Sequence, residues 1–474
     1  MGDRLQHYVD GAWRDPLAPV LLAVENPADG SVAGRIALGA AADVDRAVAA
    51  ARAAFPAWAA TTPDERIAHL ARITGELQAR LPDLAATIMR EMGAPITFAR
   101  QVQADTAIGH LRQAMATLRD FRFEEPGDGY GVVYEPVGVA GFITAWNWPI
   151  NLIMTKLAYG LAAGCTVVLK PSEIAPLSAC ILADAIHAAG LPAGVFNLVQ
   201  GDGAGVGAAI SAHPGIDLVS FTGSTRAGVQ VAKAAADTVK RVHQELGGKS
   251  ANIILPDADL PRVVETGVRR AFANSGQSCQ APTRMLVHVD QVDQVVAIAA
   301  RVAGAIRVGD PALQDTEMGP VVSAAQYDRV QAMIRSGLDA GARIAAGGPG
   351  KPAGLEHGHY VRPTIFHGVT PDMEIAQEEI FGPVLPIIAY RDEDEAVEIA
   401  NGTRYGLSSY IQSADAARAM RLARRMRAGR AYVNTVQHHL GAPFGGYKQS
   451  GNGREQGPHG LAEFLEIKAI ITAG

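Results

Sequence analysis

Three cysteines could supply a nucleophile, and their surroundings differ. Cys165 precedes the apolar run VVL, and Cys180 falls within a predicted helix. A free cysteine is usually a small buried apolar residue, which suits both positions. Cys279 instead lies in the polar run NSGQSCQAPTR, directly after a predicted helix. A loop at the end of an element can expose a thiol to backbone N–H groups that lower its pKa. Cys279 is therefore the candidate nucleophile.

Glu245 is the candidate general base. It lies in HQELGGKS, where we expect the end of the helix that follows a strand at 217–223. The helix dipole disfavours a carboxylate at a C-terminus, so this one needs a reason to be there. Gly247 and Gly248 suit a helix C-terminus and permit close approach of the backbone. Two interpretations stay open: a solvated glutamate, or a carboxylate that activates water beside a thiol.

Two glycine-rich segments follow predicted strands and could bind a phosphate. GDGAGVG (201–207) contains a GxGxxA pattern, which is a weak dinucleotide signature without an acidic residue after the next strand. In FTGSTRAG (221–228) a strand ends at Gly223, and Ser224 can cap the next helix. Free N–H groups and the dipole favour a phosphate at such a helix N-terminus.

KPSE (170–173) also follows a predicted strand. Lys170 and Glu173 could bind the hydroxyls of a ribose there. The alternative is an ordinary turn between a strand and a helix.

The elements that must position these residues alternate between strand and helix. Residues 40–119 predict consecutive helices, and residues 121–142 predict strands. Further strands are expected at 139–144, 165–170, 195–199, 217–223 and 251–255, with helices between them. This alternation predicts a parallel sheet with helical crossovers. A second α/β unit follows, with strands at 283–289, 384–390 and 431–434 and helices at 261–275 and 323–340.

The last predicted strand, FLEIKAII (464–471), has no obvious local partner. The strands at 121–135 likewise carry apolar residues without an evident partner in the first unit. Exposed strand edges of this kind invite pairing with another chain.

Composition excludes several classes of protein. The chain has 474 residues, 48% hydrophobic and 19% charged, which is typical of a folded protein of two or three domains. A net charge of −6 without a dense basic patch argues against nucleic-acid binding. The 13 histidines and three cysteines form no metal-binding motif. We find no signal peptide and no apolar run of membrane-spanning length, and therefore expect a cytoplasmic protein that binds no membrane and no metal.

Eight motifs together resemble the NAD(P)-dependent aldehyde dehydrogenase superfamily. They occur in the family's order over about two thirds of the chain: AWNWP (145–149), KPSE (170–173), FTGS (221–224), ELGGKS (245–250), GQSC (276–279), EEIFGPVL (378–385), NGTRYGL (401–407) and PFGGYKQSGNGRE (443–455). Each motif alone is a modest signal. Their order in one chain is what identifies the resemblance.

The resemblance implies an aldehyde dehydrogenase-like α/β fold in three parts. The Rossmann-type NAD-binding domain would comprise residues 1–119 and 137–247, and the α/β catalytic domain residues 248–446. A small β extension for oligomerisation would comprise residues 120–136 and 459–474. In the family, the equivalent hairpin pairs with strands of a neighbouring subunit, which implies a homodimer or homotetramer.

The resemblance also assigns catalytic roles. Cys279 matches the nucleophile that attacks the aldehyde carbon to give a thiohemiacetal, from which a hydride leaves for the nicotinamide to give a thioester. Asn147 matches the side chain that stabilises the oxyanion together with the backbone N–H of Cys279. Glu245 matches the general base that activates water to hydrolyse the thioester.

The implied cofactor is NAD, with NADP possible. The positions that match cofactor contacts in the family are Trp146, Lys170, Glu173, Gly223, Ser224, Glu379 and Phe381. Glu173 would accept hydrogen bonds from the adenosine ribose and repel a 2′-phosphate, which favours NAD. The resemblance places GDGAGVG near the adenine and not at a phosphate.

Three alternatives to a hydrolytic aldehyde dehydrogenase are a semialdehyde dehydrogenase, a CoA-acylating relative and a catalytically silent structural homologue. Acylating members tend to lack the glutamate of the ELGG motif, and Glu245 is present. A silent homologue is disfavoured because Cys279, Glu245 and Asn147 are all intact.

The positions that match the family's substrate tunnel are Trp148, Asn151, Met154, Thr155, Ala273, Ser278, Gln280 and His438 to Leu440. Thr155 and Ala273 are small, so we expect a roomy tunnel. No arginine occurs in this set, so a carboxylate-bearing semialdehyde lacks an obvious anchor. We therefore expect a longer apolar, terpenoid or aromatic aldehyde as the substrate.

Overall fold

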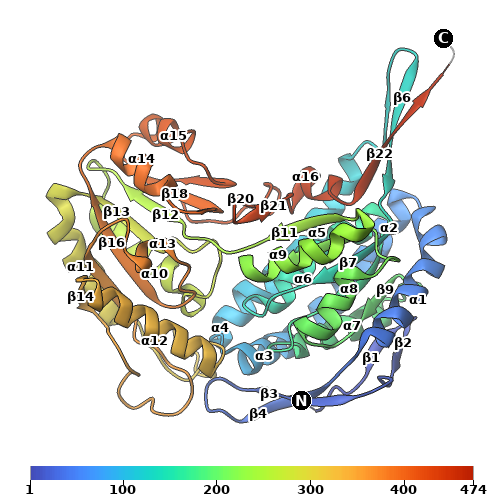
Figure 1. The fold of residues 1–474 in the computed structure, drawn as a ribbon, viewed down its shortest axis with the longest axis horizontal. Helices are drawn as coiled ribbons and strands as arrows, with labels where there is room; N and C mark the ends of the chain where they lie inside the picture. The colour runs from blue at the N-terminus through green and yellow to red at the C-terminus, as the bar shows by residue number, and fades with distance from the viewer. Residues whose placement is uncertain (1, 473–474) are drawn as a thin grey trace.

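Two separate sheets organise the chain into two lobes, and a third sheet projects from the first lobe (Figure 1). The computed structural model describes residues 2–472. It confirms the predicted α/β architecture with a small β extension. The predicted domain boundaries stay a prediction, and their outermost residues, 1 and 473–474, lie outside the described residues.

The sheet of the first lobe has eight strands in the order β2-β1-β9-β8-β7-β10-β11-β21. Its five central strands are parallel: β7 (Val139–Ile143), β8 (Thr166–Lys170), β9 (Phe196–Leu198), β10 (Leu218–Thr222) and β11 (Arg241–Glu245). The edges are antiparallel: β1 (His7–Val9), β2 (Ala12–Arg14) and β21 (Gly451–Asn452). Every residue of β7, β8 and β10 is buried, as expected for strands covered on both faces.

Alternate side chains of these strands belong to two different cores. In β8, Val167 and Leu169 join one apolar cluster, whereas Val168 joins the other. The first cluster includes side chains of α2 (Pro63–Ala79), α3 (Leu81–Met92), α5 (Asp105–Asp120), α6 (Pro149–Ala163) and α7 (Leu177–Ala188). The second includes side chains of α1 (Ala41–Ala59), α8 (Ala208–Ala212) and α9 (Thr225–Ala235). The two-residue period of a strand thus builds a layer of helices on each face.

The second lobe repeats this plan around seven strands in the order β14-β15-β16-β13-β12-β18-β19. All are parallel except β14: β14 (Arg343–Ala346), β15 (Thr364–Val369), β16 (Val384–Tyr390), β13 (Arg284–His288), β12 (Ala251–Ile254), β18 (Ser408–Gln412) and β19 (Arg430–Val433). One apolar cluster involves α10 (Leu260–Phe272) and α11 (Val292–Ala305). The other involves α12 (Ala324–Asp339), α13 (Glu374–Gln377), α14 (Glu393–Asn401) and α15 (Ala416–Ala423).

The last predicted strand, for which no local partner was evident, has a partner far away in the sequence. β22 (Leu465–Ile471) pairs antiparallel with β6 (Tyr130–Pro136) over its whole length, and β6 also pairs with β5 (Glu124–Pro126). This sheet projects from the first lobe, and β22 runs outward toward its tip (Figure 1). The partner was not evident because more than 300 residues separate the two strands in sequence.

Several short elements complete the fold. The sequence predicted the helices of residues 40–119, but it missed β1, β2 and the hairpin of β3 (Val20–Glu25) and β4 (Val32–Leu38). The remaining elements are α4 (Ile96–Phe98), β17 (Tyr405–Gly406), β20 (Tyr447–Lys448), α16 (Gly457–Ala462), π-helical turns at Ala99–Ala104 and Gly203–Gly207, and 3-10 turns at Ala236–Thr238, Ala273–Gly276 and Val289–Gln291.

The strand order of the first lobe creates a crevice between two loops. Along the chain, β7, β8 and β9 are added in one direction across the sheet, whereas β10 and β11 are added on the other side of β7. The loops that follow β7 and β10 therefore diverge at the carboxyl ends of neighbouring strands. Open parallel sheets bind ligands at such a topological switch point.

Two searches of residues 2–472 gave negative results. No helix there combines the length and apolar character needed to cross a membrane. No cluster of three or more His, Cys, Asp or Glu side chains there could hold a metal ion.

Candidate active site

Cys279 lies where two cavities meet. It belongs to the loop between the 3-10 turn Ala273–Gly276 and β13. One cavity, of about 230 Å³, is also lined by Asn147 and Glu245. The other, of about 100 Å³, is also lined by Trp148 and Gln280. The thiol is thus accessible from two compartments, as a nucleophile between a substrate and a cofactor must be.

Asn274 links the backbone of the loop after β7 to the backbone of the loop that carries Cys279. Its side-chain nitrogen donates hydrogen bonds to the carbonyl oxygens of Asn147 (2.8 Å) and Gln277 (3.1 Å). Its side-chain oxygen accepts a hydrogen bond from Gln103 of the first lobe at 2.9 Å. Asn274 and Ser275 have φ of 57°, in the left-handed region, where asparagine is among the better tolerated residues. The strained turn before Cys279 is therefore fixed by buried amide contacts.

Asn147 places an amide donor beside the Cys279 loop. It follows β7, and only 3% of its surface is exposed. Its side-chain nitrogen donates to the carbonyl oxygen of Gln277 at 3.1 Å. The neighbouring Trp148 donates its indole N–H to the hydroxyl of Ser278 at 2.8 Å. The loop after β7 and the loop that carries Cys279 are thereby held together.

Glu245 does not end a helix, contrary to the prediction. It is the last residue of β11, because α9 ends at Ala235 and the chain returns into the sheet. Its carboxyl group is therefore presented at the carboxyl edge of a parallel strand. The side chain is 3% exposed, and neither carboxyl oxygen has a hydrogen-bond partner within residues 2–472.

Burial raises the pKa of Glu245 well above its ordinary value, and the nearby carboxylate of Glu455 raises it further. Lys156 opposes this effect, since its ammonium group favours the charged form of Glu245. Lys156 contacts Glu455 at 2.6 Å and donates to Ser220 at 3.0 Å. The base candidate thus lies beside a buried ion pair that can influence its protonation.

His243 completes this polar cluster behind the site. Its ring nitrogens lie 3.1 Å from the hydroxyl of Ser220 and 3.4 Å from Glu245 Oε1. Burial lowers the pKa of His243 well below its ordinary value, and the charge of Lys156 adds to that effect. The imidazole is therefore neutral at physiological pH.

The prediction that backbone N–H groups lower the pKa of Cys279 is wrong for this state of the molecule. Burial raises the pKa of the thiol, and the carboxylates of Glu379, Glu245 and Glu455 raise it further. The N–H of Gln280 acts in the opposite direction, but its effect is smaller. The side chain is partly accessible from the cavities, but protein surrounds it, so Cys279 rests as a thiol.

Cofactor-binding candidates from both lobes line the cavity of about 230 Å³: Trp146, Gly223, Ser224, Glu379 and Phe381. The rings of Trp146 and Phe381 meet edge to face at 5.3 Å. The Ser224 hydroxyl accepts a hydrogen bond from the N–H of Ala227 and so caps α9, as predicted. A Cβ on Gly223 would lie 2.5 Å from the Phe221 ring, so a larger residue beside this helix start would displace that ring.

Gly247 and Gly248 serve close approach of the two lobes and not a helix end. The N–H of Gly248 donates to Glu379 Oε1 at 2.8 Å. A Cβ on Gly248 would lie 2.2 Å from the carbonyl oxygen of Cys279, and one on Gly247 would lie 2.6 Å from Glu379 Oε2. These two glycines therefore let the segment after Glu245 pass between Cys279 and Glu379.

Lys170 and Glu173 do not line this cavity. They form an ion pair of 2.8 Å at the end of β8, where Lys170 is paired with Ile143 of β7. Lys170 therefore lies beside the start of the loop that carries Trp146. The GDGAGVG segment forms a π-helical turn whose Gly207 lies near the side chain of Lys170.

Comparisons with known proteins decide the family. A sequence model described as "Aldehyde dehydrogenase family" matches residues 13–470. The chain is 52% identical over 472 residues, covering 99% of both chains, to 3-succinoylsemialdehyde-pyridine dehydrogenase of Pseudomonas sp. The chain belongs to the aldehyde dehydrogenase family.

Solved structures agree with this assignment. A mutant of aldehyde dehydrogenase C from Pseudomonas syringae, in complex with NAD+ and octanal, is 53% identical with a TM-score of 0.98, covering 98% of this chain and 96% of that chain. An aldehyde dehydrogenase of Mycobacterium tuberculosis in complex with NAD+ is 38% identical with a TM-score of 0.97, covering 100% and 99% of the two chains. This aldehyde dehydrogenase is thus an oxidoreductase that acts on aldehydes with NAD as its cofactor.

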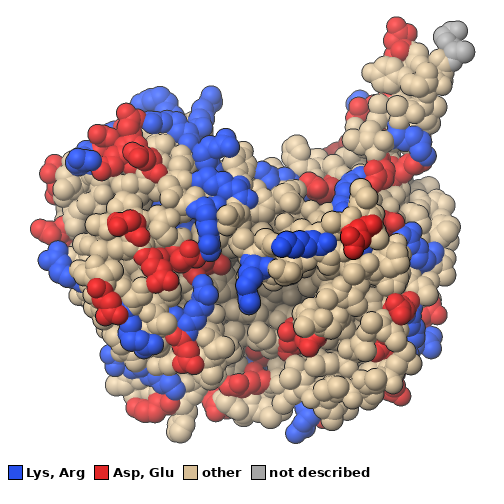
Figure 2. Space-filling model, in the orientation of Figure 1, with Lys and Arg blue, Asp and Glu red and all other residues tan. Residues whose placement is uncertain are grey.

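The first cavity of this aldehyde dehydrogenase fits a dinucleotide. It lies at the switch point of the first sheet and combines a capped helix start, an aromatic pair and the Glu379 carboxylate. Figure 2 shows the surface hollowed between the two lobes, with Lys and Arg side chains beside the hollow. The sequence missed Gln326 and Arg329, which line this cavity from α12. No motif marked them, since they lie on an ordinary amphipathic helix.

The second cavity of this aldehyde dehydrogenase matches the predicted substrate tunnel in part. Six expected residues line it: Trp148, Asn151, Thr155, Ser278, Gln280 and His438. Met154 is fully buried and does not line it, nor do Ala273, His439 or Leu440. The predicted set contains no arginine, but Arg270 of α10, one turn outside that set, also lines the cavity.

Proposed function

We propose that the enzyme oxidises an aldehyde to a carboxylic acid through a covalent intermediate on Cys279. The observation that carries the proposal is the position of this thiol at the junction of the two cavities, with Asn147 and Glu245 lining the first. An aldehyde enters through the second cavity, and its carbonyl carbon meets the thiol. Because the resting thiol is protonated, the attack requires loss of its proton to solvent through the cavity.

Asn147 stabilises the negative oxygen that forms when sulfur attacks the carbonyl. Its amide nitrogen lies in the loop that is held against the Cys279 loop, and the backbone N–H of Cys279 is the second donor. A preorganised donor of this kind contributes about 3 kcal/mol to a transition state. When bound, NAD supplies the acceptor for the two electrons and the hydrogen that leave the aldehyde carbon.

Glu245 then activates the water that hydrolyses the resulting thioester. The raised pKa of Glu245 lies closer to neutral pH, and a general base is most effective when its pKa is near the operating pH. The presence of this glutamate supports transfer of the acyl group to water and not to coenzyme A. The Lys156–Glu455 ion pair lies behind Glu245, and its charges can compensate for the change in charge when Glu245 takes up a proton.

Seven residues are proposed to hold the dinucleotide: Trp146, Lys170, Glu173, Gly223, Ser224, Glu379 and Phe381. Gly223 and Ser224 would place the pyrophosphate at the start of α9. Glu379 would accept hydrogen bonds from the ribose next to the nicotinamide, with Phe381 and Trp146 packed beside it. Lys170 and Glu173, at the end of β8, would contact the adenosine ribose and favour NAD over NADP.

The substrate is proposed to be an aldehyde with a longer apolar or aromatic body. The second cavity is lined partly by Trp148, Leu152 and Phe444, and Trp148 stacks edge to face on Phe98 at 5.4 Å. The relatives point in the same direction, because one solved structure contains octanal and one related enzyme is named for a pyridine semialdehyde. The latter name also supports a semialdehyde as the substrate.

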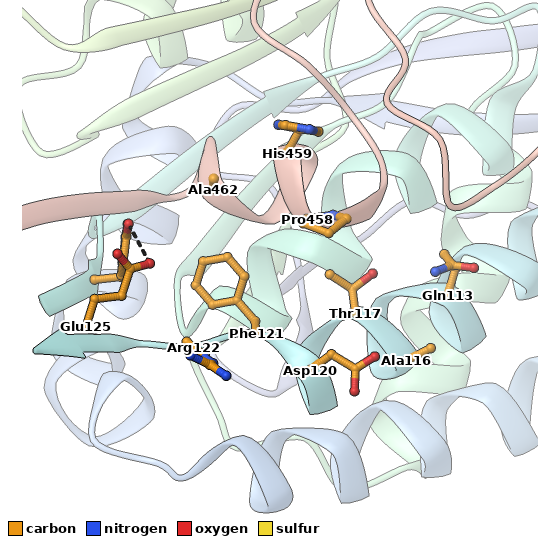
Figure 3. Close-up of a pocket in the computed structure, with 11 residues that line it drawn as sticks. Gln113, Ala116, Thr117, Asp120, Phe121, Arg122, Glu125, Pro458, His459 and Ala462 are labelled. Carbon is orange, nitrogen blue, oxygen red and sulfur yellow. Dashed lines mark hydrogen bonds between the residues drawn. The ribbon is translucent and has the colours of Figure 1, made fainter. Parts of the chain in front are cut away.

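Assembly into a homodimer or homotetramer is proposed through the projecting sheet. Its outer strand exposes apolar side chains, with Ile467 70% and Ile471 76% accessible. At the base of this sheet, the surface holds a hollow of about 520 Å³ between α5, the segment 121–125 and α16 (Figure 3). Phe121 points into this hollow (Figure 3). Exposed apolar surface beside a free strand edge is what a second copy of the chain would cover.

The compartment is proposed to be the cytoplasm. All three cysteines are free, and Cys165 and Cys180 are buried without a disulfide partner. Free thiols are typical of a reducing compartment.

Replacement of Cys279 tests the proposal. Cys279→Ala removes the nucleophile, so aldehyde-dependent NADH formation falls to background while NAD binding, measured by fluorescence quenching, persists. Cys165→Ala and Cys180→Ala are matched controls that retain most of the activity, because both side chains are buried in the first lobe. Turnover in Cys279→Ala at the rate of the unaltered enzyme would overturn the proposal.

A further inference from the structure

Arg270 is an unpaired cation at the substrate cavity. It lies in the last turn of α10 and lines the cavity of about 100 Å³ together with Cys279. None of the ion pairs formed within residues 2–472 includes it, and its Nε is buried without a hydrogen-bond partner. Its neighbour Arg269 is paired with Glu265 at 3.0 Å and with Glu317 at 2.6 Å. Protein carboxylates therefore pair with Arg269 but not with Arg270.

The guanidinium group of Arg270 is located by two aromatic neighbours. It contacts the hydroxyl of Tyr410, which itself donates a hydrogen bond to the carbonyl oxygen of Gln280 at 2.8 Å. Tyr410 is held in place by stacking on Tyr432, with ring centroids 4.6 Å apart. His438 lines the same cavity, and its pKa is lowered to about 3, chiefly by burial and then by Arg430. Arg270 contributes to the same lowering.

The other charged groups around the cavity already have partners. Glu455 contacts Lys156 at 2.6 Å. Arg430 donates to the carbonyl oxygen of Pro443 at 2.7 Å and to Gln456 at 2.8 Å. His438 is neutral because its pKa is far below physiological pH. Within residues 2–472, no carboxylate is left to balance Arg270, and a partly buried guanidinium without an anionic partner is unfavourable.

We propose that Arg270 binds an oxygen atom at the end of the substrate that lies away from the aldehyde. The enzyme would then act on aldehydes that carry a second carbonyl-type oxygen, either a carboxylate or a ketone, in preference to plain alkyl aldehydes. Arginine suits this task because its planar N–H donors match such oxygens, and charge-assisted hydrogen bonds are the stronger ones. This inference rests on the proposed function, since it presumes that the aldehyde reaches Cys279 through the cavity that Arg270 lines.

Two pairs of substrates test the proposal. Succinic semialdehyde is compared with pentanal, and an aryl keto aldehyde is compared with the same aldehyde lacking the ketone. In each pair, the ratio of kcat/KM for the oxygen-bearing member to that for the plain member is measured. Arg270→Gln lowers this ratio at least about tenfold in one pair or both, the size expected for loss of a charge-assisted hydrogen bond. Loss in the first pair only identifies a carboxylate, and loss in the second only identifies a ketone.

Two further variants complete the test. Arg269→Gln leaves both ratios unchanged, because its side chain is engaged by Glu265 and Glu317 outside the cavity. Arg270→Lys keeps the charge and so gives a measurement even where Arg270→Gln does not fold. Its kcat/KM ratios should lie between those of the unaltered enzyme and those of an enzyme that does not distinguish the two members of a pair. Ratios in the Arg270 variants that equal those of the unaltered enzyme would overturn the inference. Failure of the proposed function would give a different result from failure of this inference, because Cys279→Ala would then still turn over plain aldehydes.

Discussion

The Asn274 side chain offers a sharp test of how the Cys279 loop is held. Replacing it by alanine removes three buried hydrogen bonds, to Asn147, to Gln277 and from Gln103. Each contributes about 1 kcal/mol to stability, and a buried group left without a partner costs about 1–3 kcal/mol more. Alanine must also adopt the left-handed φ of 57°, which costs about 1–2 kcal/mol for a residue with a Cβ. We therefore expect Asn274→Ala to lower the free energy of unfolding by about 5–8 kcal/mol, the sum of these contributions.

Glycine at the same position separates the two causes. Asn274→Gly loses the same three hydrogen bonds but adopts a positive φ freely, so it should be about 1 kcal/mol more stable than Asn274→Ala. Urea unfolding of both variants and of the unaltered enzyme, under one set of conditions, gives the comparison. Both variants should also lose kcat, because Asn147 and the Cys279 loop lose a shared anchor. A loss below 1 kcal/mol in Asn274→Ala, or a glycine variant less stable than the alanine variant, would refute the reasoning.

Three further predictions concern pH, cofactor choice and assembly. Because burial raises the pKa of Glu245 above its ordinary 4.5 and hydrolysis needs the carboxylate, kcat falls as pH drops through that raised pKa; a kcat that stays flat down to pH 4.5 would contradict this. Glu173→Gln raises kcat/KM with NADP relative to NAD, since a carboxylate that repels a 2′-phosphate is gone; an unchanged ratio would show that Glu173 faces away. Deleting residues 464–474 removes Phe464 and Leu465 from the core of the first lobe, so the product should be insoluble or monomeric and inactive. Light scattering of the intact 49.6 kDa chain should give two or four times that mass, and the mass of a single chain would contradict the prediction.

Much of the fold was predictable because it depends on local patterns. Continuous apolar runs predicted the buried parallel strands, and β16 has the predicted bounds 384–390. Pairings between distant segments were not predictable in this way, as the contact of β22 with β6 shows. The strands β1 and β2 were missed because each has only three residues, and β3 was missed because it is largely exposed and so carries little apolar periodicity.

The candidate site was predictable to the extent that motifs mark residues. Cys279, Asn147 and Glu245 were named from their segments, and the fold brings them to one cavity. The local environments were not predictable. Glu245 ends a strand, and the pKa of the Cys279 thiol is raised first by burial and then by carboxylates from three other segments. Arg270 was missed for the same reason, since nothing in the sequence near it indicates that Tyr410 and His438 flank its side chain.

The most direct test of the central claim is to detect the acyl group on Cys279. Glu245→Gln forms the thioester but lacks the base that hydrolyses it, so mixing this variant with aldehyde and NAD should give a burst of NADH followed by a stall. Mass spectrometry of the stalled protein should then show the acyl group on the peptide that contains Cys279 and on neither peptide with Cys165 or Cys180. An acyl group on another residue, or equal slowing of the burst and the steady rate with no acyl-enzyme, would contradict the account.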